Sequence, residues 1–165
     1  MADKTLIKVA VEILIEAESY QVFNALTTGT AIWWATPYLQ RKDARDLVME
    51  PKVGGRFYER WTLNKNDSKG YLHATVIAID SPKLLRLQGP FGMADRAAWG
   101  TATVKLKPIN DNTYVHFSFH AFGELNETIE VEYARGWNDL LGRLKFYVEE
   151  GAAQGIKHDP SLSLD

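Results

Sequence analysis

The chain has 165 residues, of which 45% are apolar, 24% charged and 12% aromatic, which is the balance of one ordinary soluble domain. Lys and Arg number 19 against 21 Asp and Glu, so the net charge is −2, and no basic run predicts binding of nucleic acid or of an anionic membrane. The absence of cysteine excludes thiol catalysis, disulfides and Cys-based metal sites.

The N-terminal residues show no basic segment followed by a long apolar stretch, as a secretory signal would. The longest apolar run is also far shorter than the ~18 residues that a membrane span needs. We therefore expect a cytoplasmic protein without membrane insertion.

The first third of the chain predicts a strand, two short helices and a second strand. Residues 6–16 form a β-branched run with partial alternation, typical of a long strand. Ser19 is the expected N-cap of a helix over 20–26. A second helix is expected from Thr30 until Pro37 ends it, and a short strand follows the charged loop.

The middle of the chain predicts an antiparallel sheet, because apolar segments recur between turn residues. The expected strands of this part are 47–50, 56–63, 71–79, 84–87, 99–107 and 114–122.

The C-terminal part changes its period from two residues to between three and four. Asn126 is the expected N-cap and Gly151 the stop of a helix of roughly 22 residues. Residues 152–165 are expected to form a flexible tail. The apolar stripe of the helix consists of Ile129, Tyr133, Trp137, Leu140, Leu141, Leu144 and Val148.

These elements predict an α+β fold in the order β-α-α-β6-α, forming a single domain over 1–165 with its core at about 6–150. A curved antiparallel sheet of about seven strands wraps around the long C-terminal helix. Because the sheet coils while the helix is straight, a cavity between them is expected.

Several motifs occur in the order and spacing of a known family: Val22 to Thr27, Ile32 to Trp34, Val53 to Phe57, Ile79 to Pro82, and Gly136-Trp137 with the leucines that follow. The chain resembles the family of heat-shock-protein-90 ATPase activator homologues, in the START-like, polyketide-cyclase-like superfamily (SRPBCC, Bet v-type) that also contains the birch-pollen allergen type. The resemblance covers about 9–149 and implies the helix-grip fold with a cavity between sheet and long helix. It implies less about activity, because one fold hosts many functions.

Two titratable residues are candidates for polar anchors in the cavity. Glu59 lies between Phe57 and Trp61 on one side of a strand, so its carboxylate faces the cavity if those rings do. The alternative is a bulge after the glycine pair that turns Glu59 to solvent. His73 faces either the same cavity or the exposed end of its strand.

The remaining histidines suggest no site. His116 and His120 are expected on the outer face of a strand, where four residues span ~13 Å, too far for a shared metal. His158 lies in the polar tail. We predict no metal, no cofactor and no catalytic set from residue spacing.

Aromatic residues are abundant, with five Trp, seven Tyr and seven Phe. They either line a small-molecule pocket or fill a packed core. Trp33 and Trp34 are neighbours on a helix, so one is expected in the core and the other at the rim. With the anchors Glu59 and His73, the predicted ligand-binding residues are Trp34, Phe57, Trp61, Trp99, Phe119, Tyr133 and Trp137.

The leading functional hypothesis is a non-catalytic or weakly catalytic protein that binds a small hydrophobic ligand, aromatic or lipid-like. One alternative is a cyclase or lyase in which Glu59 or His73 moves a proton. The other is a co-chaperone of the heat-shock-protein-90 ATPase, which is disfavoured because the activators of the resembling family carry a separate N-terminal domain that does not fit ahead of Leu6. A homodimer is left open.

Overall fold

The fold is that of a computed structural model of the chain, described here for residues 3–64 and 66–151. The tail expected at 152–165 lies outside these residues. In chain order the elements are β1 (Asp3–Ile15), α1 (Ser19–Leu26), α2 (Thr30–Trp33), the 3₁₀ helix η1 (Thr36–Tyr38), β2 (Asp46–Met49), β3 (Arg56–Arg60), β4 (Gly70–Asp80), β5 (Leu84–Gly89), β6 (Ala98–Ile109), β7 (Asn112–Asn126) and α3 (Glu127–Glu150).

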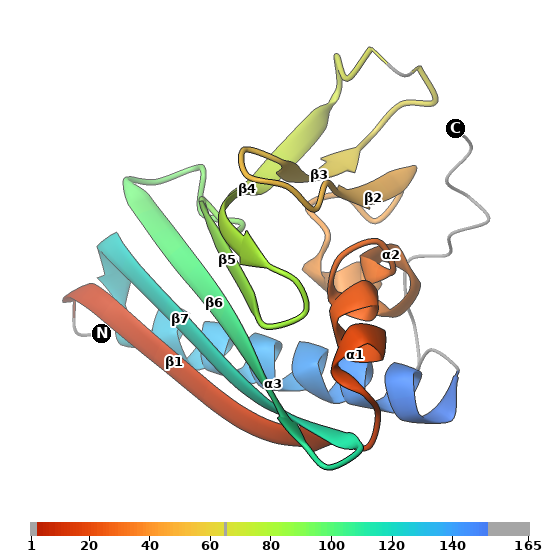
Figure 1. Cartoon of the computed structure of the whole chain (residues 1–165). Coiled ribbons are helices and arrows are strands. Elements are labelled where there is room, and N and C mark those ends of the chain that lie inside the picture. Colours follow the sequence, from red (N-terminus) through yellow and green to blue (C-terminus); the bar gives the residue numbers. More distant parts are fainter. Residues whose placement is uncertain (1–2, 65, 152–165) are drawn as a thin grey trace.

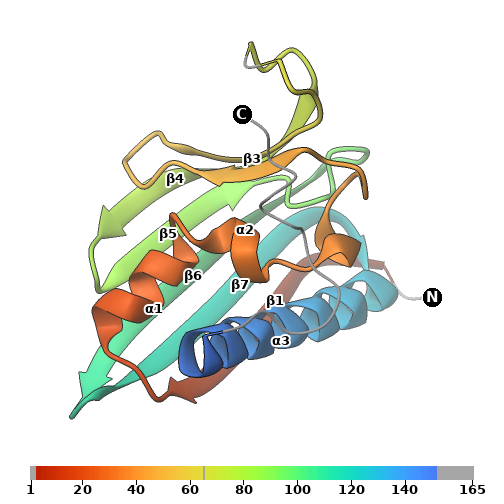
Figure 2. The ribbon, with the colours of Figure 1, turned by 90° about the vertical axis from the view of Figure 1, so that its right-hand side faces the viewer.

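The strands form one curved sheet of seven, with every neighbouring pair antiparallel, in the order β1-β7-β6-β5-β4-β3-β2. All the helices lie on its concave side, with α3 running along the sheet and α1 and α2 beside it (Figures 1 and 2). This arrangement confirms the predicted α+β helix-grip fold.

Alternation along β7 shows why the sheet has one apolar face. Val115, Phe117 and Phe119 are buried on the inner face, while His116 and His120, at the alternate positions, are exposed on the outer face. The outward position predicted for these two histidines is therefore confirmed.

The long helix α3 begins and ends where the sequence indicates. The Asn126 side chain accepts a hydrogen bond from the Ile129 amide at 2.9 Å, and Gly151 ends the helix with φ of 71°. Leu140, Leu141 and the other residues of the predicted stripe pack against the core.

Side chains of α3 also cover β1, which is an edge strand of the sheet. Glu149 accepts a hydrogen bond from the Glu16 amide at 2.7 Å, and the Lys145 ammonium donates to the Leu14 carbonyl at 2.7 Å. Lys4 forms an ion pair with Glu130 at 2.7 Å near the other end. The bond to Leu14 uses a main-chain group of β1 that would otherwise be open to pairing with another chain.

Several element ends differ from the sequence prediction. Ser19 is the first helical residue rather than the N-cap, because its hydroxyl is hydrogen-bonded to Thr113 at 3.0 Å, while Gln21 bonds back to the Glu18 amide. The second helix stops at Trp33, and Pro37 lies in η1. Both tryptophans at this point, Trp33 and Trp34, are buried.

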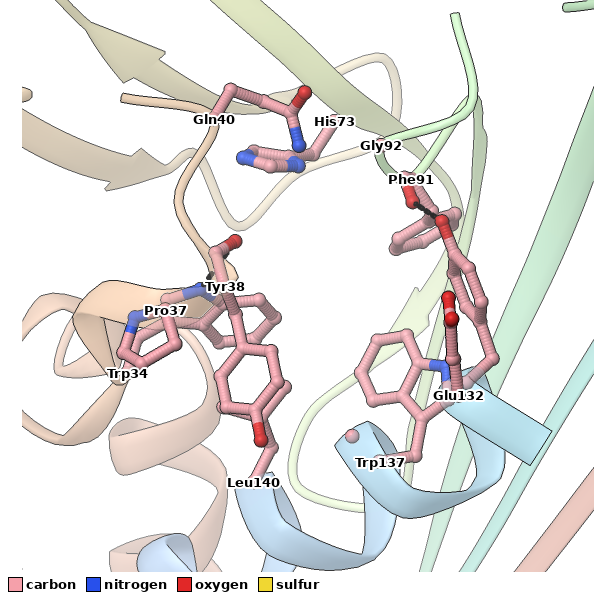
Figure 3. Close-up of a pocket in the computed structure, with 12 residues that line it drawn as sticks. Trp34, Pro37, Tyr38, Gln40, His73, Phe91, Gly92, Glu132, Trp137 and Leu140 are labelled. Carbon is pink, nitrogen blue, oxygen red and sulfur yellow. Dashed lines mark hydrogen bonds between the residues drawn. The ribbon is translucent and has the colours of Figure 1, made fainter. Parts of the chain in front are cut away.

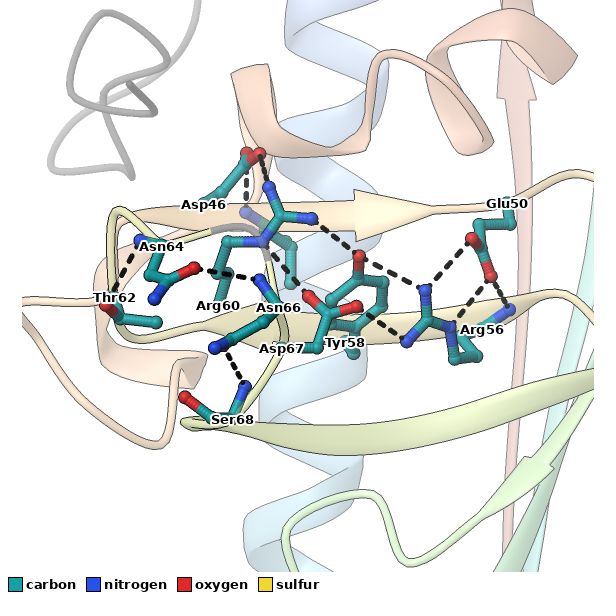
Figure 4. Close-up of polar contacts among 11 residues, drawn as sticks. Asp46, Glu50, Arg56, Tyr58, Arg60, Thr62, Asn64, Asn66, Asp67 and Ser68 are labelled. Carbon is teal, nitrogen blue, oxygen red and sulfur yellow. Dashed lines mark hydrogen bonds and ion pairs between the residues drawn. The ribbon is translucent and has the colours of Figure 1, made fainter. Parts of the chain in front are cut away.

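The strand β3 is shorter than predicted and carries a polar network on its outer side (Figure 4). Arg56 lies over the Tyr58 ring at 4.3 Å and bonds both Glu50 and Asp67. Arg60 bonds Asp67 and the Tyr58 hydroxyl from the other side. The network covers Tyr58 and joins β3 to the β3–β4 loop, so the inner side of β3 is held in place.

Within the described residues, no helix is both long and apolar enough to cross a lipid bilayer.

A glycine in β7 gives a test of this backbone. Gly123 has φ of 124°, and a Cβ added there would lie 1.9 Å from the Ala97 carbonyl oxygen. Gly123→Ala should therefore lower the free energy of unfolding by about 2 kcal/mol, or roughly 4–8 °C in Tm. The matched control is Gly142→Ala in α3, where a Cβ meets nothing within 4 Å. It should raise stability by about 1 kcal/mol. Equal Tm values for the two variants in thermal denaturation would contradict this account.

Candidate functional site

A cleft opens between α3 and the far end of the sheet, with a volume of about 280 Å³ (Figure 3). Its walls come from η1 and the residues on either side of it, from β4, from the β5–β6 loop and from α3. The lining residues are Trp34, Pro37, Tyr38, Gln40, His73, Phe91, Gly92, Glu132, Tyr133, Gly136, Trp137 and Leu140.

Aromatic rings packed edge to face form the inner end of the cleft. The ring centroid of Trp137 lies 6.2 Å from that of Trp34 and 5.8 Å from that of Phe91. Behind these rings is a small void of about 40 Å³, which Phe57 also lines. The rings thus separate an open cleft from a nearly filled core.

A buried carboxylate holds one wall of the cleft. Glu59 has no exposed surface, and its Oε2 atom lies 2.7 Å from Nε2 of His73. The backbone amides of Gln40 and Arg41 donate to the two carboxylate oxygens at 2.5 and 3.3 Å, and the indole of Trp61 donates at 2.9 Å. Four donors from three parts of the chain therefore converge on one side chain.

These donors keep Glu59 ionised. Burial by itself would raise the pKa of the Glu59 carboxyl, but the hydrogen bonds from His73, Gln40 and Trp61 outweigh burial and hold the pKa below its ordinary value. An ionised carboxylate only accepts hydrogen bonds, so Nε2 of His73 carries a proton.

The opposite wall is the β5–β6 loop, which is tied down at several points. Phe91 has a positive φ of 44° and donates its amide to the His73 carbonyl at 3.0 Å. The Tyr133 hydroxyl donates to the Phe91 carbonyl at 2.6 Å, and the Tyr71 hydroxyl accepts from the Gly92 amide at 3.1 Å. Burial raises the pKa of Tyr133 to about 12, so its hydroxyl stays protonated at neutral pH.

A third wall is attached to α3 through Tyr38. Its hydroxyl donates to Asp139 at 2.5 Å, and Asp139 also bonds Arg143 one helical turn further on. Burial, with the hydrogen bond to Asp139 next in importance, raises the pKa of Tyr38 to about 12. The donor role of Tyr38 is therefore kept at neutral pH.

Four of the residues predicted from the sequence as ligand contacts line this cleft: Trp34, His73, Tyr133 and Trp137. Phe57 lies beside the small void instead, and Glu59 lies behind His73. Phe119 stacks under Tyr133, with ring centroids 5.5 Å apart. Their part in ligand binding stays a prediction.

Two tryptophans lie elsewhere, and their predicted place in the cavity wall is wrong. Trp99 is 42% exposed on the outer face of the sheet. Neighbouring residues of a strand point to opposite faces, and in β6 it is Gly100, next to Trp99, that faces inward against the Phe119 ring. Trp61 lies past the end of β3, where its indole bonds Glu59 and the Arg41 guanidinium covers its ring at 5.1 Å.

Other cleft residues were not predicted from the sequence. Tyr38 ends the three-residue helix η1, and Gln40, Phe91 and Gly92 lie in irregular segments, so no period of two or 3.6 residues indicates which way these side chains point. The glycines on both sides of Phe91 were the one available signal of an unusual loop.

Among residues 3–64 and 66–151, no group of three or more His, Asp or Glu side chains is placed to hold a metal ion.

Comparison with known proteins gives one family and many similar structures. The family model described as "Activator of Hsp90 ATPase homolog 1-like protein" matches residues 16–149. No curated protein matches the sequence.

Three solved structures show how far the similarity extends. The Aha1 dimer of Colwellia psychrerythraea is 21% identical, with a TM-score of 0.62 over 88% of this chain and 98% of the other. A conserved protein of unknown function from Enterococcus faecalis is 22% identical, with a TM-score of 0.63 over 99% of this chain and 86% of the other. An uncharacterised protein from Rhizobium leguminosarum is 17% identical, with a TM-score of 0.65 over 91% of this chain and 99% of the other. At these identities the similarity shows the fold.

The role of the buried carboxylate is tested with Glu59→Gln. The carboxylate of Glu59 accepts hydrogen bonds only from N–H groups, whereas the amide of Gln would place its own N–H group opposite one of them. The free energy of unfolding at pH 7 should therefore fall by about 3 kcal/mol. Because the pKa of Glu59 is depressed in the fold, its contribution is present above pH 4.5, its ordinary pKa, and is lost as pH falls below that value.

Urea denaturation across pH measures both effects. The gap between wild type and Glu59→Gln should narrow below pH 4.5. Glu12→Gln, which changes an exposed carboxylate, is the control and should cost little at any pH. A gap that stays constant down to acid pH would contradict an ionised Glu59.

Proposed function

The chain belongs to the family of Activator of Hsp90 ATPase homolog 1-like proteins, and on that premise we propose that it binds a small aromatic or otherwise apolar molecule in the cleft between sheet and α3. The observation that supports the proposal most is the cleft itself, about 280 Å³ in volume and walled by the rings of Trp34, Phe91, Tyr133 and Trp137. A concave apolar surface with a few polar groups is the usual form of a small-molecule site.

The fixed walls also favour binding. Tyr133 and Tyr71 tie the β5–β6 loop, Asp139 holds Tyr38, and Glu59 fixes His73 from behind. A ligand that enters a preformed cleft orders few side chains, so less of its interaction energy is offset by lost entropy.

Two glycines keep the cleft open. A Cβ on Gly136 would lie 3.3 Å from the Tyr38 ring, and one on Gly92 would lie 3.2 Å from the Tyr133 hydroxyl. Larger side chains at these positions would occupy space that a ligand needs.

A second candidate function is proton transfer, as in a cyclase or lyase. It is favoured by the hydrogen bond between His73 and Glu59, because a carboxylate behind an imidazole is a common arrangement for a general base. Loss of turnover of an identified substrate in His73→Gln, with binding retained, would support this function.

A chaperone partner is a third candidate, supported by the description of the family alone. The related Colwellia protein is described as a dimer, so a homodimer also stays a prediction for this chain. Adding the purified chain to a purified Hsp90 and measuring its ATPase rate tests the chaperone partner. Analytical ultracentrifugation of the purified chain tests the homodimer.

The binding proposal is tested by filling the cleft. At least one member of a panel of one-ring and two-ring aromatic compounds should stabilise the wild-type protein. At a ligand concentration about a hundredfold above Kd, the free energy of unfolding should rise by about 2.7 kcal/mol, which is roughly 5–10 °C in Tm. Gly136→Leu should abolish this shift, because its side chain occupies the cleft beside Tyr38.

The control for this experiment is Gly142→Leu, on the same helix, where a Cβ meets nothing within 4 Å. It should keep the full shift. The proposal fails if no compound stabilises wild type, or if Gly136→Leu responds as wild type does.

A further inference from the structure

One ring nitrogen of His73 faces the cleft without a partner. Nε2 is bonded to Glu59 at 2.7 Å, whereas no described residue forms a hydrogen bond with Nδ1. His73 lines the cleft, and its side chain is only 4% exposed (Figure 3). The exposed part of this side chain therefore lies in the cleft.

The carboxylate behind the ring decides what this nitrogen can do. Glu59 accepts hydrogen bonds from Gln40, Arg41 and Trp61 as well as from His73, which fixes its position. Because Nε2 donates to the carboxylate, Nδ1 is the ring nitrogen that remains for a ligand, and in the imidazole form of the ring it carries a lone pair. The cleft thus contains a hydrogen-bond acceptor whose direction is set by a buried anion.

The other polar groups of the cleft do not duplicate this acceptor. The hydroxyls of Tyr133 and Tyr38 donate to Phe91 and Asp139, and a phenol oxygen, whose lone pair is delocalised into its ring, is a weaker acceptor than an imidazole nitrogen. The carboxylate of Glu132 belongs to an exposed residue, in contact with water. The amide of Gln40 belongs to a second exposed residue, which lies beside His73.

The size of the cleft limits the ligand. An apolar cavity of roughly 150 Å³ holds one benzene ring. A cleft of about 280 Å³ therefore matches about two fused rings. Trp34 and Trp137 offer ring faces and edges for such a molecule.

We propose that the cleft selects a hydroxylated aromatic molecule of about two fused rings, whose hydroxyl donates a hydrogen bond to Nδ1 of His73 while its rings pack against Trp34 and Trp137. This inference rests on the proposed binding function and adds the chemical group that is recognised. An aromatic molecule without a donor would bury Nδ1 unpaired, so it should bind at least about tenfold more weakly.

The test compares naphthol with its methyl ether and with naphthalene, each titrated into wild type by calorimetry. Naphthol should bind about tenfold more tightly than either of the others, which lack a donor. In His73→Gln the amide can still donate to Glu59 from the position of Nε2, but nothing occupies the position of Nδ1. The preference for naphthol should disappear in this variant, while the affinity for naphthalene stays unchanged.

Gln40→Ala is the matched control and should keep the preference for naphthol. If the preference survives in His73→Gln, or is lost in Gln40→Ala instead, the proposal is overturned. Equal binding of the three compounds to wild type would also overturn it, while leaving the aromatic cleft as a binding site. Binding of none of them, together with no response to the wider aromatic panel, would remove the proposed function itself.

A measurement on wild type alone covers the case in which the variant does not fold. The Nδ1 resonance of His73 in nitrogen NMR should move when naphthol is added and stay in place when naphthalene is added. A resonance that responds to both compounds alike, or to neither, would count against the hydrogen bond.

Discussion

The site depends on one constraint: a carboxylate without exposed surface must be fully hydrogen-bonded, or the fold loses several kcal/mol. Glu59 meets this requirement by drawing in the amides of residues 40 and 41, the indole of Trp61 and the imidazole of His73. The irregular segment after η1 is thereby joined to β3 and β4, and with it one wall of the cleft. The buried carboxylate is stable here because these donors surround it, and one of them is the imidazole of His73, which lines the cleft.

The curvature of the sheet and the straightness of α3 account for the rest of the cavity. Where the two are close, leucines of the helix stripe fill the space; where they diverge, rings close it only in part, and the glycines at 92 and 136 leave it open. The same helix also contacts the edge strand β1, where Lys145 donates to the Leu14 carbonyl and Glu149 accepts from the amide of Glu16 just after the strand. One element thus covers the core, bounds the cleft and protects an edge strand.

A shared fold does not fix the function of this chain. Structures at 17–22% identity share this fold over most of their length, which shows that the backbone does not need these particular side chains. A common fold hosts different functions because function lies in the side chains of the site. For this chain the informative ones are the rings around the cleft and the pair of Glu59 and His73.

The sequence by itself determined the order of elements, the antiparallel sheet and the long helix, because period, caps and turn residues act locally: Asn126 and Gly151 bound α3, and alternation places His116 and His120 outward. It also indicated Glu59 and His73 as candidates. Only the tertiary structure decided which way they point, since the register shift between β3 and β4 leaves His73 as an extra residue opposite Phe57 and Tyr58, and both His73 and Ala74 are buried. The tertiary structure also decided that Trp99 is exposed, because its neighbour in β6 faces the core instead. Phe91 is buried because Tyr133 and Tyr71, which are distant in sequence, hold its loop in place.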